Sequence, residues 1–178
     1  MGLGPGKPLF TRFEDQAPEA MCELHEELLT VKDTRAKALA AEGLRKHAAS
    51  PDSPHILAVV DELATLTAFA ERKVTQRIDR ALGLLLTQGR ACGITVLAAV
   101  QDPGKDVVGW RALFPTRLAL RLDNPIHVDM ILRDGARDQG ARADHLSEFN
   151  SGVAFMRLDG TRAIRCVRPS YLTDADLT

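Results

Sequence analysis

Two adjacent carboxylates stand directly after a short apolar run. The run is "ILAVV", residues 56–60, and Asp61 and Glu62 follow it. A non-alternating apolar run of this length predicts a strand buried on both faces of a parallel sheet. Ligands of such sheets collect where the carboxyl ends of the strands emerge. There, one carboxylate can hold a magnesium ion while the other orients or deprotonates an attacking water.

A third polar residue closes the next apolar run. Gln101 follows "ITVLAAV", residues 94–100, and the carboxyl ends of parallel strands emerge at one edge of a sheet. An amide at this edge can bond both a phosphate oxygen and a water. Each feature also has a plain interpretation, as a charged strand end at the surface or a polar cap before the Pro103 turn. Two such strand ends, one crossover apart, favour a site more than either does alone.

The surrounding pattern supplies the elements that position these side chains. Helical periodicity covers residues 18–47 and 74–92, so the two apolar runs are joined as strand, helix and strand, which indicates a right-handed parallel crossover. Further elements are predicted as a strand nearer an edge (116–122), a short helix (125–132) and a hairpin around Asp159-Gly160 (152–169). The fold class is therefore α/β with a late antiparallel hairpin.

The composition predicts an ordinary globular domain. The 178 residues are 45% hydrophobic and 26% charged, with a net charge of −1 that neither supports nor excludes nucleic acid. Cys22, Cys92 and Cys166 have no zinc-site spacing and indicate reduced cytosolic thiols. No apolar stretch reaches the ~20 residues of a membrane span. We expect one domain over 1–178, with a loop and helical segment at 1–54 and an α/β core at 55–172.

Several segments in order resemble the motor domains of the FtsK/SpoIIIE family of DNA translocases, including the related plasmid-transfer proteins of actinomycetes. They are "ILAVVDELATL", "LLLTQGRACGITVLAAVQDP", "LFPTRLALRL" and "HVDMILRDGA", and the resemblance covers about residues 56–172. It implies a RecA-like P-loop NTPase, a three-layer sandwich with a mainly parallel sheet. It also implies a cytoplasmic ring, usually a hexamer, that uses ATP and Mg²⁺ to move double-stranded DNA in chromosome segregation or conjugation. Any membrane anchor would lie outside this chain.

The resemblance assigns roles to the polar strand ends. Asp61 matches the Walker B aspartate, which holds Mg²⁺ through water, and Glu62 matches the catalytic glutamate. Gln101 matches the sensor glutamine, although Val100 and Asp102 stand where the family usually has threonine and arginine.

Two arginines match recurrent arginines of the family. One of Arg90 and Arg117 is expected to act as an arginine finger on the γ-phosphate of a neighbouring subunit, because a planar cation suits spreading phosphoryl charge. The alternatives are a solvated helix C-terminus for Arg90, and a structural ion pair or surface charge for Arg117.

Two further segments match family segments that face DNA in the pore. The first, residues 71–80, carries Arg72, Lys73, Arg77 and Arg80, which can follow phosphates without reading bases. A solvated basic helix face is the open alternative. In the second, residues 125–137, Asp129 replaces a usual arginine and leaves Arg133 and Arg137 as the basic candidates.

The phosphate-binding sequence G-x-x-x-x-G-K-[ST] is absent from the 178 residues. The nearest match, "GLGPGKP", has Pro8 where the magnesium-binding hydroxyl belongs, so Lys7 is not assigned to phosphate. We therefore expect an incomplete domain that alone hydrolyses little or no ATP. Besides a DNA translocase, two functions stay open: a type VII secretion ATPase module, stimulated by a secreted substrate instead of DNA, and a non-catalytic assembly module.

Overall fold

The computed structural model describes residues 11–176 apart from 15–16, 69, 105–107 and 174–175. The segment "GLGPGKP", with Lys7, lies outside the described residues. The chain divides into two compact units that adjoin in sequence between Asp102 and Pro103. None of the described helices is both long and apolar enough to cross a bilayer.

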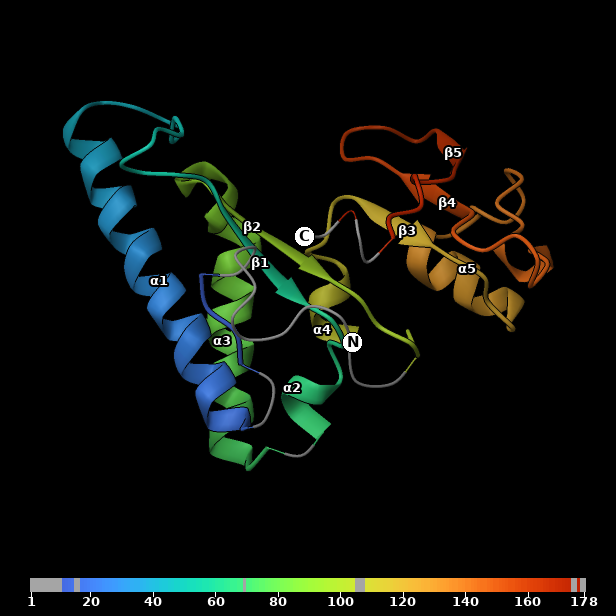
Figure 1. The fold of residues 1–178 in the computed structure, drawn as a ribbon, viewed down its shortest axis with the longest axis horizontal. Coiled ribbons are helices and arrows are strands. Elements are labelled where there is room, and N and C mark those ends of the chain that lie inside the picture. Colours follow the sequence, from blue (N-terminus) through green and yellow to red (C-terminus); the bar gives the residue numbers. More distant parts are fainter. Residues whose placement is uncertain (1–10, 15–16, 69, 105–107, 174–175, 177–178) are drawn as a thin grey trace. The chain divides into compact units, whose positions relative to one another are not determined.

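The first unit is built around a parallel pair of strands. Its elements in chain order are α1 (Pro18–Ala41), β1 (Ile56–Val60), α2 (Thr65–Ala68), α3 (Arg72–Gln88), the 3₁₀ turn η1 (Gly89–Cys92) and β2 (Ile94–Ala98). β1 and β2 pair in parallel with Ile56 opposite Ile94 and Val60 opposite Ala98. The predicted strand, helix and strand therefore form, with α3 as the connecting helix (Figure 1).

Helix α3 is amphipathic and carries most of this unit's core. Its buried residues recur at helical spacing: Val74, Ile78, Ala81, Leu82 and Leu85. Helix α1 packs along α3 (Figure 1).

Two polar contacts hold α1 against α3. The Arg77 guanidinium pairs with the Glu26 carboxylate, and the buried Lys32 ammonium donates to the Gln88 side-chain oxygen at 2.9 Å. Both contacts fix the position of the helix that connects the two strands.

One face of the strand pair is open. Leu57, Val59 and Leu97 are 56%, 51% and 55% exposed, and the register places them on the same face, with Val59 opposite Leu97. The prediction of a strand buried on both faces is therefore wrong for β1. The physical reason is that α1 packs against α3, so the described helices leave this face of the strands uncovered.

The second unit is a three-stranded antiparallel sheet with a helix against it. Its elements are α4 (Val108–Arg111), β3 (Arg117–Ala119), α5 (Pro125–Leu132), the 3₁₀ turn η2 (Ala143–His145), β4 (Ala154–Arg157) and β5 (Ile164–Val167). Strand β4 lies between β3 and β5 and is antiparallel to both. Among the described strands only β1 and β2 pair in parallel, which differs from the mainly parallel sheet expected. A short turn such as the one joining β4 to β5 permits only antiparallel pairing.

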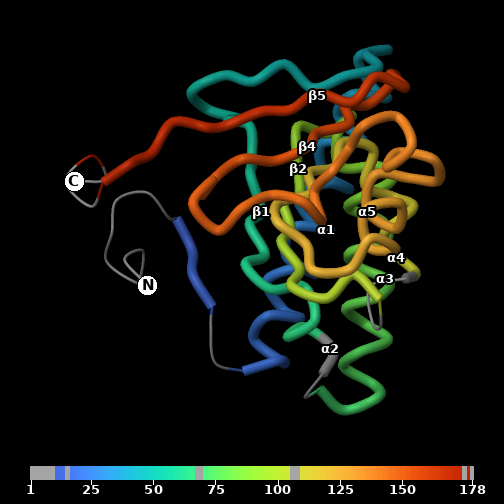
Figure 2. The backbone as a smooth tube through the Cα atoms, turned by 90° about the vertical axis from the view of Figure 1, so that its right-hand side faces the viewer, coloured from blue at the N-terminus to red at the C-terminus, as the bar shows by residue number. Residues whose placement is uncertain are grey.

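Local sequence explains why α5 begins where it does. The Asn124 side chain accepts a hydrogen bond from the Ile126 N–H at 3.0 Å, and Pro125 occupies the first turn, where its missing N–H costs nothing. Val128 and Leu132 on this helix are buried with a group of small residues: Ala119, Ala136, Ala141 and Ala143. The helix is thereby fixed against β3 (Figure 1), and Figure 2 shows the same helix after a turn of 90°.

The turn into β2 requires glycine. Gly93 has a φ of 71°, and a Cβ there would lie 2.2 Å from the His47 ring and 3.1 Å from Arg35. Neither neighbour can move freely, because the His47 ring is hydrogen-bonded through Nε2 to the Ser53 carbonyl oxygen at 3.0 Å and Arg35 donates to the Cys92 carbonyl at 3.0 Å.

We expect Gly93→Ala to lower the free energy of unfolding by about 2 kcal/mol or more, from left-handed strain together with the clash. Gly83→Ala is the matched control: Gly83 lies inside α3, where an added Cβ would meet no atom within 4 Å, and the change should stabilise by up to about 1 kcal/mol. Urea unfolding of both variants measures the difference. Equal stability of the two would contradict this account of the turn.

Candidate functional site

The two strand ends predicted to form a site are brought together. Asp61 and Glu62 follow β1, and Gln101 follows β2 after two further residues. The backbone joins these ends closely, since the Ala99 N–H donates to the Val60 carbonyl at 2.9 Å and the Leu63 N–H donates to the Ala99 carbonyl at 2.8 Å. The chain therefore leaves both strands at the same edge, as the parallel pairing requires.

The Glu62 carboxylate links the two ends directly. One of its oxygens accepts a hydrogen bond from the Gln101 N–H at 3.0 Å, and the other accepts from the Ala64 N–H at 3.1 Å. A carboxylate has about four lone-pair positions, so each oxygen keeps capacity to accept a hydrogen bond from a water. The geometry fixes the direction of this carboxylate before any ligand arrives.

Asp61 is placed differently from Glu62. It is exposed, and in the part of the chain that the structure describes no hydrogen bond or ion pair occupies its carboxylate. The Gln101 side chain is also exposed. Both groups are available to a ligand at this edge.

The donor set fits magnesium only as a partial site. Mg²⁺ commonly takes one or two protein carboxylates and completes its shell with waters and phosphate oxygens, which Asp61 with Glu62 nearby can satisfy. A complete cage is not formed, since the described residues contain no group of three or more His, Cys, Asp or Glu able to hold a metal ion.

Of the two arginines considered as fingers, Arg90 lies in the same unit as this edge but away from it, and Arg117 belongs to the second unit. Arg90 is exposed in η1, at the amino end of β2, so the length of that strand separates it from Gln101. Arg117 begins β3 in the second unit and donates from Nε to the Phe114 carbonyl at 2.8 Å and from Nη1 to the Ile131 carbonyl at 3.1 Å. Its partners are backbone carbonyls instead of the carboxylate that a structural ion pair would need.

The basic residues of α3 divide into two kinds. Arg72 and Lys73 lie in the first turn, are exposed, and make no ion pair within the described residues. Arg77 is held by Glu26 of α1, and this hydrogen-bonded ion pair raises the pKa of the guanidinium. Arg77 thus already has a structural partner, whereas Arg72 and Lys73 present their charges to solvent.

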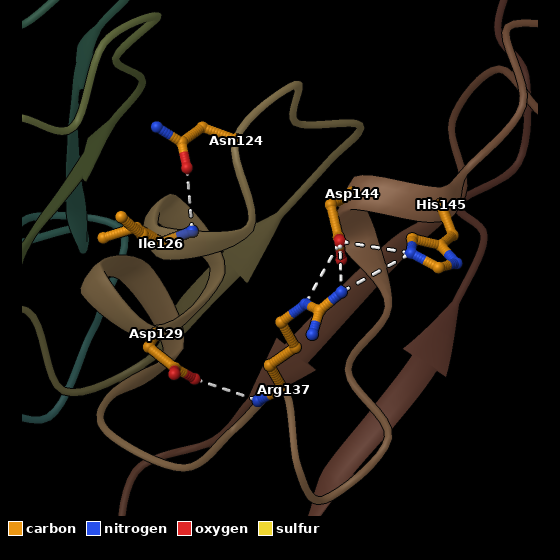
Figure 3. A network of polar contacts seen from close by, with 6 residues as sticks. All are labelled: Asn124, Ile126, Asp129, Arg137, Asp144 and His145. Carbon is orange, nitrogen blue, oxygen red and sulfur yellow. Dashed lines mark hydrogen bonds and ion pairs between the residues drawn. The ribbon is translucent and has the colours of Figure 1, made fainter.

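The second basic segment, residues 125–137, also contains one arginine paired with a carboxylate and one exposed arginine. Arg137 donates from Nε and Nη2 to Asp144 Oδ2 at 3.1 and 2.8 Å, and its backbone N–H donates to Asp129 at 2.9 Å (Figure 3). The Asp144 side chain is only 3% exposed, and the hydrogen bonds from Arg137 hold the pKa of Asp144 below its usual value. Arg133, in contrast, is exposed directly after α5.

Sequence reasoning missed the acidic partners of these arginines. Glu26 lies 51 residues before Arg77, and Asp144 lies seven residues after Arg137. Neither separation matches the three-to-four spacing by which ion pairs are recognised along one helix. For Asp129, the departure from the usual arginine now has a structural counterpart, because its carboxylate accepts the Arg137 N–H.

Two solved structures share this fold. The pCW3 conjugation coupling protein TcpA, solved as a monomer with ATPgS, matches 83% of this chain and 44% of its own, with a TM-score of 0.67 and 21% identity. The cytoplasmic domain of the type VII secretion ATPase EccC of Thermomonospora curvata matches 86% of this chain and 18% of its own, with a TM-score of 0.62 and 17% identity. The α/β architecture with parallel and antiparallel sheets therefore resembles those of TcpA and EccC.

Curated relatives by sequence are DNA translocases. SftA of Bacillus subtilis (strain 168) is 30% identical over 118 residues, which are 65% of this chain and 12% of SftA. FtsK 1 of Neisseria meningitidis serogroup A is 34% identical over 113 residues, which are 58% of this chain and 13% of that protein. No family model matches the chain. The chain is thus identified as an FtsK/SpoIIIE-like segment that matches a small part of these much longer translocases.

Proposed function

We propose that this chain is part of an ATP-driven motor that moves double-stranded DNA. The observation that carries the proposal is the hydrogen bond from the Gln101 N–H to Glu62, which joins two polar strand ends at one edge of a parallel pair. The similarity to DNA translocases supports it. The substrate is inferred from those relatives, of which this chain covers only 12% and 13%.

In the proposed mechanism Asp61, Glu62 and Gln101 have separate roles at this edge. Asp61, which is exposed and has no partner among the described residues, would hold Mg²⁺ through water, and the ion would supply positive charge to the phosphate oxygens of ATP. Glu62 is already oriented by two backbone amides and would position the attacking water. The Gln101 side chain would sense whether a γ-phosphate is present. The phosphate-binding loop that ATP needs does not occur among the 178 residues, so this chain would contribute one half of a nucleotide site.

Oligomerisation is part of the proposal because of where Arg90 lies. The five residues of β2, at about 3.3 Å each, set it roughly 16 Å or more from Gln101 of the same chain. An arginine at the opposite end of the strand would serve as a finger on a neighbouring subunit, as in a hexameric ring.

DNA contact would come from exposed cations that make no ion pair within the described part of the chain. Arg72 and Lys73 in the first turn of α3 and Arg133 after α5 satisfy this condition. Such contacts neutralise phosphates without reading sequence. Arg77 and Arg137 would contribute less, since each would first have to leave a carboxylate.

A secretion ATPase module is the second candidate. It is favoured by the fold likeness to EccC, which spans 86% of the chain. A protein-secreting module has no need of DNA affinity, so DNA binding separates the two candidates.

We expect the double variant Arg72→Gln/Lys73→Gln to bind a fluorescein-labelled 30-base-pair duplex more weakly than the parent chain, with random duplexes affected equally. Loss of two phosphate contacts should reduce the slope of log affinity against log salt by about 2. Fluorescence anisotropy over a salt series measures this. The matched control is Arg45→Gln/Lys46→Gln, another exposed Arg-Lys pair. Absence of duplex binding by the parent, or equal slopes for both double variants, would contradict the DNA proposal.

The role of Glu62 as a link predicts a stability difference between the adjacent carboxylates. Glu62→Gln replaces one accepting oxygen by an NH₂ group that faces a backbone N–H, so the unfolding free energy should fall by about 1–2 kcal/mol. Asp61→Asn removes an exposed charge and should change it by less than about 0.5 kcal/mol. Chemical denaturation of both variants measures the effect. If Asp61→Asn proved the more destabilising, Glu62 would not be the group that holds the strand ends.

A further inference from the structure

Two arginines stand directly opposite each other in the second unit. Arg117 of β3 and Arg157 of β4 are register partners in the antiparallel pair. Side chains of directly opposed residues share one face, with Cβ atoms about 5 Å apart, and like charges at such a position are destabilising. Negative charge near the two guanidinium groups would therefore stabilise this pair.

The carboxyl end of α5 provides some of that charge. Arg117 Nη1 donates to the Ile131 carbonyl at 3.1 Å, and Arg157 Nη1 donates to the Leu132 carbonyl at 3.0 Å. These adjacent carbonyls bring the two guanidinium groups to the same place. A helix end carries about half a negative charge, which is too little for two whole positive charges.

Both guanidinium groups keep donors for a further ligand. Each has five N–H groups. Arg117 also donates to the Phe114 carbonyl and Arg157 to the Thr161 carbonyl, so the hydrogen bonds to carbonyls use two of the five in each case.

Two more arginines of this unit, Arg111 and Arg133, make no ion pair with a carboxylate of the described residues. Arg111 Nε is buried and has no hydrogen-bond partner. Arg133 directly follows α5 with φ 80° and ψ 161°, the one positive φ of a non-glycine residue in the described part of the chain. This conformation is nearly restricted to glycine, and such strain is found mostly at functional sites.

The four arginines are close enough to affect one another. Burial lowers the pKa of Arg117, and the charges of Arg133, Arg111 and Arg157 lower it further. Within the described residues none of the four makes an ion pair with a carboxylate. Capping of α5 explains Arg117 and Arg157, but it leaves the positions of Arg111 and Arg133 unexplained.

We propose that Arg111, Arg117, Arg133 and Arg157, the arginine cluster, bind a multiply charged phosphate group. Planar guanidinium forks match phosphate oxygens in pairs, and a compact group of four suits a ligand with two or more negative charges. The phosphate can come from a nucleoside polyphosphate or from the DNA backbone. Binding of phosphate by the arginine cluster stands on the geometry of the second unit, whereas the DNA backbone as its source rests on the function proposed above, which already assigns Arg133 to DNA.

Isothermal titration with inorganic pyrophosphate at low ionic strength tests the cluster. Arg111→Gln and Arg133→Gln leave the hydrogen bonds to α5 intact, and each should weaken pyrophosphate binding about tenfold through loss of a charge-assisted contact. Arg121→Gln is the control, since it removes the same charge from an exposed arginine paired with Asp123 at 4.0 Å. No binding by the parent chain, or equal weakening in all three variants, would overturn the proposal. Circular dichroism confirms that the variants are folded.

A competition experiment then identifies the source of the phosphate. Displacement of pyrophosphate by duplex DNA would support the cluster as a site for backbone phosphates, and displacement by ATP but not by duplex would support it as a nucleotide-phosphate site. Failure of both to compete would overturn the assignment to either source. The variants at Arg72 and Lys73 leave the cluster unchanged, so failure of the DNA proposal is distinguishable from failure of this one.

Discussion

The parallel pairing of β1 and β2 is the constraint on which the candidate site depends. Parallel strands release the chain at the same edge, and here that edge receives Asp61, Glu62 and Gln101. The Glu62 carboxylate then fixes the two exits to each other through backbone N–H groups. One residue thus combines a structural link with the position from which a water can be oriented. A site of this kind needs few additional side chains, because the sheet itself positions the functional residues.

The arginines of the chain differ in the groups that they contact. Arg77 and Arg137 are each neutralised by one carboxylate and hold segments together. Arg117 and Arg157 are satisfied by carbonyls, which accept hydrogen bonds but carry no full charge. A guanidinium charge that no carboxylate balances is stable only where solvent, salt ions or a ligand can balance it. The two kinds of arginine therefore differ in whether a carboxylate of the protein balances their charge, and the unbalanced kind is the one to which we assign phosphate binding.

Local features of this fold could be predicted from the sequence, and contacts between distant segments could not. The bounds of β1 and α5 agree with the predicted 56–60 and 125–132, because a pair of acids ends the first and Asn124-Pro125 begins the second. Strand β2 ends two residues earlier than predicted, where the Ala99 N–H and carbonyl bond to Val60 and Leu63. The edge carrying Glu62 and Gln101 was also predictable, since it follows from strand order. The Glu26 partner of Arg77 was not, because its position depends on how α1 packs.

The open face of β1 and β2 has a consequence for the thermodynamics of unfolding. Leu57, Val59 and Leu97 stay more than half hydrated in the folded chain, so unfolding exposes less new apolar surface than in a fully covered sheet. Because hydration of apolar surface is the main source of the heat-capacity increment of unfolding, that increment should be smaller per residue than the usual value of about 12–15 cal/mol/K. A smaller increment flattens the curve of stability against temperature. Covering this face would therefore add stability and also steepen its dependence on temperature.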